Sequence, residues 1–311
     1  MQYRTLGATG LKVSALAFGG SSLGSAFRKI DEGEGIRAVH TALDHGINLI
    51  DTAPYYGATT AETVLGKALV GIPRGKYLLA TKVARYGPDE KDFDFSAKRV
   101  TASIEESLTR LGVDYVDFIQ VHDMEFGNLE QIITETIPAL QRLKAAGKTR
   151  FVGISCLPVC LFRQVLDRVQ VDQIQSYCHY CLNDTALADL LPYLKQKGVA
   201  IFNSAPLAMR LLSDEGPPAW HPAPPALRAK CIEAAAFCRA RGTDIGKLAL
   251  QFSLANPDIH TNIVGTADPK RVRKNLDDIA EELDEKLLAD VQKILAPVHN
   301  LTWPSGRKEN I

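Results

Sequence analysis

Residues 96–122 read SAKRVTASIEESLTRLGVDYVDFIQVH, and in this stretch a helical pattern, a glycine and a short apolar run follow one another. The apolar residues before the glycine recur with the 3.6-residue period of one helix face, at Val100, Ile104, Leu108 and Leu111. Gly112 follows a basic last turn, where glycine adopts the left-handed conformation at little cost. The run at 116–122 is mostly apolar, as in parallel strands that are buried on both faces.

The same unit recurs along the chain. A glycine closes a helical pattern at four further positions, Gly46, Gly147, Gly198 and Gly242. Short, mostly apolar runs predict eight strands, at 13–19, 48–51, 77–82, 116–122, 150–155, 171–176, 200–204 and 261–265. Eight strands that alternate with about eight helices predict an α/β fold, the (β/α)8 or TIM barrel. A doubly wound parallel sheet is the alternative, but no Gly-x-Gly-x-x-Gly motif follows the first strand.

The regions outside this repeat are short. Residues 3–13 predict an N-terminal β-hairpin before the barrel, whereas 246–256 and 283–296 predict extra C-terminal helices. No stretch has the composition of a linker, so we expect residues 1–311 to form a single barrel domain.

Composition argues against several classes of protein. The 311 residues include 36 basic and 36 acidic side chains, which gives a formal net charge of zero. This balance argues against a nucleic-acid partner, and no apolar run approaches the roughly 20 residues of a membrane span. The N-terminus lacks the layout of a signal peptide. We therefore expect a cytoplasmic protein, monomeric or weakly dimeric, whose partner is a small molecule.

Six cysteines lie in the second half of the chain, too few for a disulfide scaffold. Cys178 and Cys181 have the C-x-x-C spacing of redox and zinc sites, but the nearest second pair, Cys156 and Cys160, is spaced differently. We expect buried or loop thiols in a reducing compartment, and no metal site.

Polar residues end the predicted strands, where TIM barrels place their active sites. The second strand ends in Asp51, the third in Lys82 and the fourth in His122. Any one of these residues alone suits a purely structural role. Ends of neighbouring strands converge, however, and an uncompensated buried charge costs several kcal/mol. We therefore expect a functional cluster.

Tyr56 follows the second strand, in the sequence DTAPYYG. A cation beside a tyrosine lowers its pKa and makes it a usable proton donor or acceptor, and Lys82 supplies such a cation, held by Asp51. His122 then hydrogen-bonds the substrate oxygen. This set suits the interconversion of an alcohol and a carbonyl, and since no side chain carries a hydride, a nicotinamide cofactor is implied. Tyr55 is an alternative for the tyrosine role.

The order and spacing of Asp51, Tyr56, Lys82 and His122 resemble the catalytic tetrad of the aldo-keto reductase superfamily. Segments 6–14 (LGATGLKVS) and 107–117 (SLTRLGVDYVD) resemble further signatures of that family, so the similarity spans essentially the whole chain. Other segments resemble its aldose 1-dehydrogenase branch, at 93–97 (FDFSA), 122–127 (HDMEFG), 176–180 (SYCHY), 206–209 (PLAM) and 216–223 (GPPAWHPA). The resemblance implies an NAD(P)-dependent enzyme that oxidises an aldose, such as L-galactose or L-fucose, at C1 to its lactone.

The resemblance also implies a cofactor site. Ser155 and Gln175 hold the nicotinamide carboxamide, but Cys156 replaces the usual asparagine after that serine. Ser204 stands where many members have a ring that stacks on the nicotinamide. The remaining cofactor residues lie in the last two strand-to-helix loops: Leu207, Gly265, Thr266, Asp268, Arg271, Lys274 and Asn275. Because Gly265 replaces a lysine common in NADP-preferring members, NAD is favoured and NADP stays possible.

Five residues in predicted loops above the barrel are candidates for the substrate site: Asp123, Phe126, His179, Trp220 and His221. Aromatic faces suit the C–H surfaces of sugars and histidines bind hydroxyls, but any one of these rings suits loop packing equally well. Asp123 either faces the substrate or supports its neighbours. Two other functions stay open, a broad NADPH-dependent reductase of aldehydes or ketones and a cofactor-binding regulatory subunit.

Overall fold

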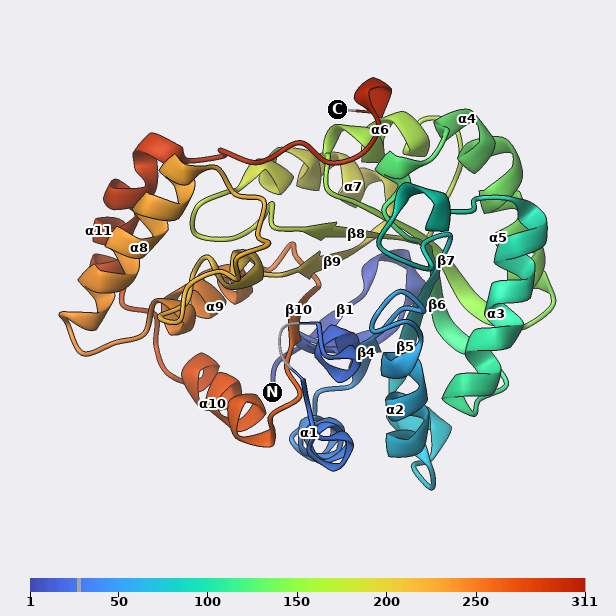
Figure 1. Ribbon diagram of the computed structural model, residues 1–311, viewed down its shortest axis with the longest axis horizontal. Helices are drawn as coiled ribbons and strands as arrows, with labels where there is room; N and C mark the ends of the chain where they lie inside the picture. Colours follow the sequence, from blue (N-terminus) through green and yellow to red (C-terminus); the bar gives the residue numbers. More distant parts are fainter. Residues whose placement is uncertain (27–28, 311) are drawn as a thin grey trace.

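The computed structural model describes residues 1–26 and 29–310, and its centre is a closed barrel of parallel strands (Figure 1). The barrel strands are β3 (Leu16–Gly19), β4 (Leu49–Asp51), β5 (Leu78–Val83), β6 (Val116–Val121), β7 (Thr149–Cys156), β8 (Gln173–Tyr177), β9 (Ala200–Ser204) and β10 (Thr261–Gly265). Each strand pairs with the next, and β10 pairs with β3 to close the ring. The predicted (β/α)8 fold is confirmed, and the doubly wound alternative is wrong, because an open sheet has no such closing pair.

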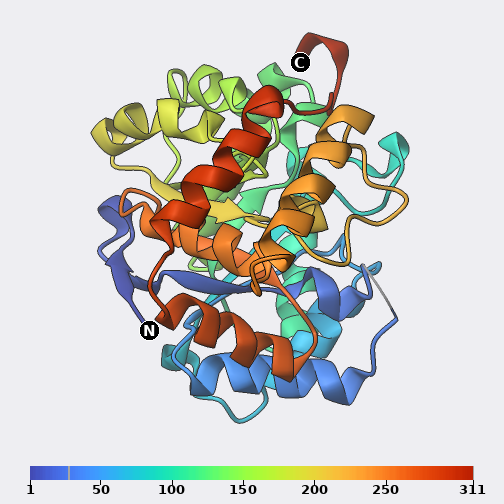
Figure 2. The ribbon, with the colours of Figure 1, turned by 90° about the vertical axis from the view of Figure 1, so that its left-hand side faces the viewer.

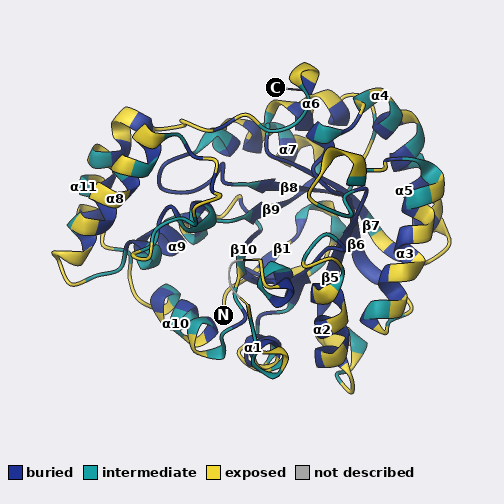
Figure 3. Ribbon diagram, in the orientation of Figure 1, coloured by how far each residue is buried: buried dark blue, intermediate teal, exposed yellow. Residues whose placement is uncertain are grey.

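Helices surround the barrel and bury one face against it, so that each shows a dark inner and a light outer side in Figure 3. In α3, Val100, Ile104 and Leu108 are buried, and Gly112 ends the helix with a φ of 66°. None of the described helices is long and apolar enough to cross a membrane. The helices are α1 (Glu32–Asp44), α2 (Thr60–Leu69), α3 (Ala97–Leu111), α4 (Leu129–Gln131), α5 (Ile137–Ala145), α6 (Cys160–Leu166), α7 (Leu191–Lys197), α8 (Pro225–Arg239), α9 (Ile245–Ala255), α10 (Pro269–Ala280) and α11 (Glu285–Leu295).

A hairpin of β1 (Tyr3–Thr5) and β2 (Lys12–Ser14) closes the N-terminal end of the barrel, as predicted. Leu6, in its connection, packs with Phe118 and Phe202 in the barrel interior. The first predicted strand, 13–19, is divided, because its start belongs to this hairpin and the barrel strand begins at Leu16. The opposite end of the barrel, where the strands finish in polar residues, is left for a binding site.

The two helices expected near the C-terminus are both present, but their places differ. The helix predicted at 246–256 is α9, which packs against β10 and α10 as part of the ring of helices. The helix predicted at 283–296 is α11, which packs beside α8 outside that ring, as both Figure 1 and Figure 2 show. Small residues allow α8 to pack closely there, since Ala234, Ala235 and Cys238 are buried.

Candidate active site

Asp51 and Lys82 form a buried ion pair at the ends of β4 and β5. Lys82 Nζ donates to both carboxylate oxygens of Asp51, at 2.7 and 2.6 Å, and to Thr52 O at 2.9 Å. Lys82 is 1% exposed and Asp51 is 2% exposed. The side-chain amides of Gln120 and Gln175 also donate to Asp51, at 3.1 and 3.3 Å. Each of the three ammonium hydrogens therefore has an acceptor, and the buried charges compensate each other.

Tyr56 is the tyrosine beside this pair. Lys82 Nζ lies 5.1 Å from the centroid of the Tyr56 ring, which is half-buried. The neighbouring Tyr55 ring is covered instead by the guanidinium of Arg85, whose Cζ lies 3.7 Å from the ring centroid. Both rings approach His122 edge-on, at centroid distances of 5.8 Å for Tyr56 and 5.9 Å for Tyr55. The contact with Lys82 therefore favours Tyr56 over Tyr55.

The expectation that Lys82 lowers the pKa of Tyr56 is wrong for this state of the protein. Burial raises the pKa of Tyr56 well above its ordinary value, the carboxylates of Asp51 and Asp123 raise it further, and Arg85 opposes them. The physical reason is that the charge of Lys82 is already matched by Asp51 at hydrogen-bonding distance. Tyr56 is therefore held in its protonated form.

His122 follows directly after β6 and is a neutral imidazole. Burial, together with the smaller effects of Lys82 and Arg85 and against that of Asp123, lowers its pKa to about 3. Nδ1 of His122 is buried and has no hydrogen-bond partner within residues 1–26 and 29–310. A neutral ring with a free nitrogen is suited to hold a ligand oxygen or hydroxyl by a hydrogen bond.

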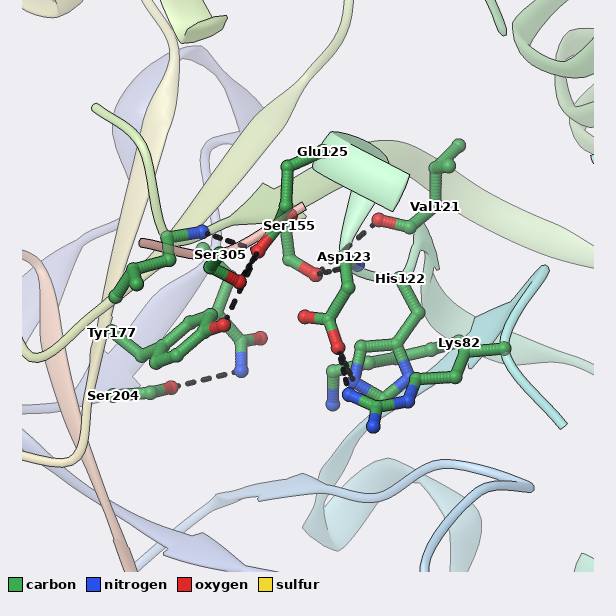
Figure 4. Close-up of polar contacts among 12 residues, drawn as sticks. Lys82, Val121, His122, Asp123, Glu125, Ser155, Tyr177, Ser204 and Ser305 are labelled. Carbon is green, nitrogen blue, oxygen red and sulfur yellow. Dashed lines mark hydrogen bonds and ion pairs between the residues drawn. The ribbon is translucent and has the colours of Figure 1, made fainter. Parts of the chain in front are cut away.

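Arg85 and Asp123 form an ion pair at the rim of this cluster. Figure 4 shows Asp123 beside His122. Asp123 Oδ2 lies 3.8 Å from His122 Nε2, and its backbone N–H donates to Ser155 Oγ at 3.2 Å. Asp123 has a φ of 49°, an unfavourable value for most side chains. These contacts hold that conformation and direct its carboxylate toward Arg85. The sequence analysis did not identify Arg85. It lies two residues after the end of β5, where TIM barrels place their active-site residues.

Comparison with known proteins identifies the family. Residues 15–296 match the sequence profile of the Aldo/keto reductase family. The chain belongs to the aldo-keto reductase family. It is 51% identical to L-galactose dehydrogenase of Arabidopsis thaliana, over 100% of this chain and 99% of that protein. It is 30% identical to D-arabinose 1-dehydrogenase of Saccharomyces cerevisiae, over 94% of each chain.

The structural comparison agrees with this assignment. The holo form of an aldo-keto reductase from Bacillus halodurans superimposes with a TM-score of 0.80 at 27% identity, and covers 100% of this chain and 99% of the other. As an aldo-keto reductase, the chain is an oxidoreductase that acts on small molecules with a nicotinamide cofactor.

The ends of β7, β8 and β9 fit the nicotinamide carboxamide of such a cofactor. Gln175 Nε2 donates to Ser204 Oγ at 2.8 Å, whereas Gln175 Oε1 is buried without a partner in the described chain. Ser155 lies beside Gln175 in the sheet register, and is 2% exposed. A buried acceptor without a donor costs free energy, so an incoming amide N–H group fits this position. Leu207 is half-buried in the loop after β9.

The loop between β10 and α10 fits the phosphate and adenosine side of the cofactor in this family. Asp268 caps α10 by accepting from Lys270 N at 2.8 Å, and Thr266 Oγ1 accepts from Asp268 N at 3.1 Å. A Cβ atom on Gly265 would lie 2.9 Å from Ser21 Oγ, so the loop after β3 approaches closely. A helix N-terminus with free backbone N–H groups favours a phosphate.

The basic residues of α10 already have acidic partners. Lys274 Nζ donates to Asp278 at 2.6 Å and lies 3.6 Å from Asp244 Oδ2. Arg271 Nη1 lies 3.9 Å from the same Asp244 oxygen, and Asn275 is buried on the same helix. These carboxylates reduce the positive potential that the two cations present to a ligand.

The predicted substrate residues fall into two groups. Phe126 stacks on Phe93 at a centroid distance of 4.8 Å and lies near Arg85, so that it joins the rim around His122 together with Asp123. His179, Trp220 and His221 lie in the loops after β8 and β9. Their available contacts differ.

His179 Nδ1 bonds Asp184 Oδ2 at 3.0 Å. His221 uses both ring nitrogens within its own loop, with Nε2 3.1 Å from Ala208 O and Nδ1 accepting from Ala223 N at 3.0 Å. Trp220 is 56% exposed and stacks on His221. The Trp220 ring is thus exposed at the loop surface, whereas the nitrogens of His221 serve its own loop.

The cysteines show no arrangement for a metal ion. Cys178 and Cys181 are buried, and Cys181 Sγ donates to Cys178 O at 3.3 Å. Burial raises the pKa of Cys178 and of Cys181, which keeps them as thiols. Cys156 donates to Pro158 O at 3.3 Å and so contacts its own loop. In the part of the chain that the structure describes, no three His, Cys, Asp or Glu residues are grouped as metal ligands.

Proposed function

We propose that this oxidoreductase is an NAD(P)-dependent aldose 1-dehydrogenase that oxidises L-galactose, or a related sugar such as L-fucose, at C1 to the lactone. The observation that carries the proposal is the Arg85–Asp123 ion pair beside His122, because a charged rim suits a substrate with several hydroxyl groups. The similarity to L-galactose dehydrogenase and D-arabinose 1-dehydrogenase supports the same substrate class.

We assign the chemical roles to four side chains. A bound nicotinamide cofactor supplies the acceptor for the hydride that leaves C1. Tyr56 Oη takes the proton of the C1 hydroxyl, for which Tyr56 must first lose its own proton. Lys82, held in place by Asp51, is the cation beside its ring. His122 donates a hydrogen bond to the sugar oxygen. The C1–H and O–H bonds break, and the C1 carbonyl of the lactone forms.

One observation favours a second candidate, a broad-specificity reductase of aldehydes or ketones. The raised pKa of Tyr56 keeps its hydroxyl protonated, and a protonated tyrosine is the donor that reduction of a carbonyl requires. The same residues serve both directions, so the choice depends on which substrate the rim accepts.

A substrate panel separates these two functions. We expect NAD⁺ reduction with L-galactose or L-fucose to show a kcat/KM at least about tenfold above that for D-glucose, a difference of about 1.4 kcal/mol in transition-state binding. Initial rates with L- and D-aldoses, and with small aldehydes plus NADPH, measure this. Faster reduction of simple aldehydes than oxidation of any sugar supports the reductase instead.

We further propose NAD as the preferred cofactor, because Asp244 and Asp278 partner the two cations that otherwise attract a 2′-phosphate. Asp244→Asn retains an oxygen to cap α9 but removes the charge. We expect its affinity for NADPH relative to NADH to rise about threefold to fivefold, as for a partly exposed ion pair. Titration of the quenching of protein fluorescence by NADH and by NADPH measures the ratio. Asp290→Asn on α11 is the matched control, and an unchanged ratio in Asp244→Asn contradicts the proposal.

We also propose a cytoplasmic location and a monomer or weak dimer. Six cysteines are free thiols in the structure, and five of them are buried, which suits a reducing compartment. Sedimentation of the purified protein measures its assembly state.

A further inference from the structure

Glu125 lies outside the proposed chemistry, yet its carboxyl group joins three segments at the mouth of the barrel. It belongs to the short turn η5 (Met124–Phe126) and is fully buried. Its Oε1 accepts from Leu157 N at 3.1 Å after β7, from Tyr177 OH at 3.3 Å at the end of β8, and from Ser305 Oγ at 3.0 Å near the C-terminus. Figure 4 shows the side chains converging on this oxygen.

The C-terminal tail, residues 303–310, is fixed on the same turn by its backbone contacts. Asn310 Nδ2 donates to Glu125 O at 2.7 Å and to Gly127 O at 2.9 Å, and Arg307 N donates to Glu125 O at 3.0 Å. A Cβ atom on Gly306 would lie 2.5 Å from Glu125 O, which leaves no room for a side chain there. In Figure 1 the tail runs from α11 across the molecule to the neighbourhood of α6.

This cluster lies directly behind the residues proposed to meet the substrate. Asp123 and His122 precede Glu125 in the same loop, so the tail contacts the segment that carries them. Tyr177 follows Gln175 by two positions on β8, which places both on one face of the strand, and it is in register with Ser204. A displacement of Glu125 would therefore affect two parts of the barrel mouth, the loop of His122 and Asp123 and the end of β8 at Tyr177.

We propose that Glu125 is a positioning residue, which holds Tyr177 and the C-terminal tail against the loop of His122 and Asp123 and so fixes the substrate side of the mouth. The effect on a sugar rests on the function proposed above, whereas the anchoring of the tail does not. Glu125 touches neither the reacting atoms nor the cofactor residues, and acts through its neighbours.

The protonation state of Glu125 supplies a distinguishing readout. The titratable groups that face it are Asp123 from its own loop, Cys156 from β7 and Tyr177 from β8, while the tail presents Ser305 and the backbone of Arg307. Burial, followed by the nearby carboxylate of Asp123, raises the pKa of Glu125 to about 8, although hydrogen bonds from Leu157 N and Ser305 oppose this shift. At neutral pH the group is thus mostly protonated, and above pH 8 it becomes a carboxylate beside Asp123.

Glu125→Ala and Glu125→Gln test the proposal, with Glu130→Gln, an exposed glutamate of α4, as the control. At pH 7 we expect Glu125→Ala to raise the KM for L-galactose about tenfold, with kcat and the Kd for NADH within about twofold, as for a lost buried hydrogen-bond group. Glu125→Gln keeps an amide oxygen in place of Oε1, so it should remain near wild type. Above pH 8 the KM should rise in the wild type and not in Glu125→Gln.

Trypsin gives a second readout that needs no substrate, because the tail contains Arg307 and the exposed Lys308. Tail cleavage, followed by mass spectrometry, should be faster in Glu125→Ala than in the wild type. If Glu125→Ala does not fold, Ser305→Ala is used in its place, because it removes one of the hydrogen bonds between Glu125 and the tail. Wild-type KM together with wild-type tail protection in these variants overturns the proposal. No turnover of any aldose by the wild type, with accelerated tail cleavage in Glu125→Ala, overturns the proposed substrate and supports the anchoring.

Discussion

Tyr56→Phe is expected to lower kcat for an aldose by roughly 10²–10⁴-fold, the range for loss of a positioned acid or base. The substitution removes only the hydroxyl group and keeps the ring, which lies beside Lys82 and His122. Binding of NADH should therefore stay within about twofold. Steady-state rates with L-galactose and titration of protein fluorescence with NADH measure the two quantities.

Tyr55→Phe is the matched control, because it removes the same atom from the next residue. The Tyr55 ring supports the guanidinium of Arg85, and phenylalanine preserves that face. We expect its kcat to remain within about fivefold of wild type. If Tyr55→Phe loses turnover and Tyr56→Phe retains it, the proton-transfer role belongs to Tyr55.

Lys82→Met is expected to abolish measurable turnover and to destabilise the protein by about 3–5 kcal/mol, since it leaves the buried carboxylate of Asp51 without its cation. Gln120 and Gln175 still donate to that carboxylate but carry no charge. Urea unfolding followed by circular dichroism measures the stability, and the sugar assay measures the turnover.

The double variant Asp51→Asn with Lys82→Met separates the two effects. It removes both charges, so we expect much of the lost stability to return while turnover stays absent. A double variant that is no more stable than Lys82→Met alone contradicts the view that an uncompensated charge causes the loss.

The chemistry of the barrel mouth could be predicted from the sequence where a residue ends a strand. Asp51, Lys82 and His122 each follow an apolar run, and parallel strands bring such ends together. The direction of the pKa shift of Tyr56 was predicted wrongly. A sequence indicates that Lys82 is near Tyr56, but it does not show that the ammonium group of Lys82 is hydrogen-bonded to both carboxylate oxygens of Asp51. Electrostatic effects depend on all neighbours at once.

Glu125 could not be predicted, for a different reason. Its partner Ser305 is 180 positions away and lies in a tail without helical or strand periodicity. No local pattern relates the two. The helix α9 shows the same limit, because its apolar spacing predicted a helix correctly, and only its contacts with β10 and α10 placed it within the ring.

The pairing of β10 with β3 also bears on how the protein folds. This pairing joins Asn262 to Leu16, so almost the whole chain must be synthesised before the first barrel strand has both of its neighbours. Contacts so distant in sequence form slowly, and an unpaired strand edge invites association with other chains. During synthesis, β3 can therefore pair only with β4, and its other edge has no strand partner until β10 emerges from the ribosome.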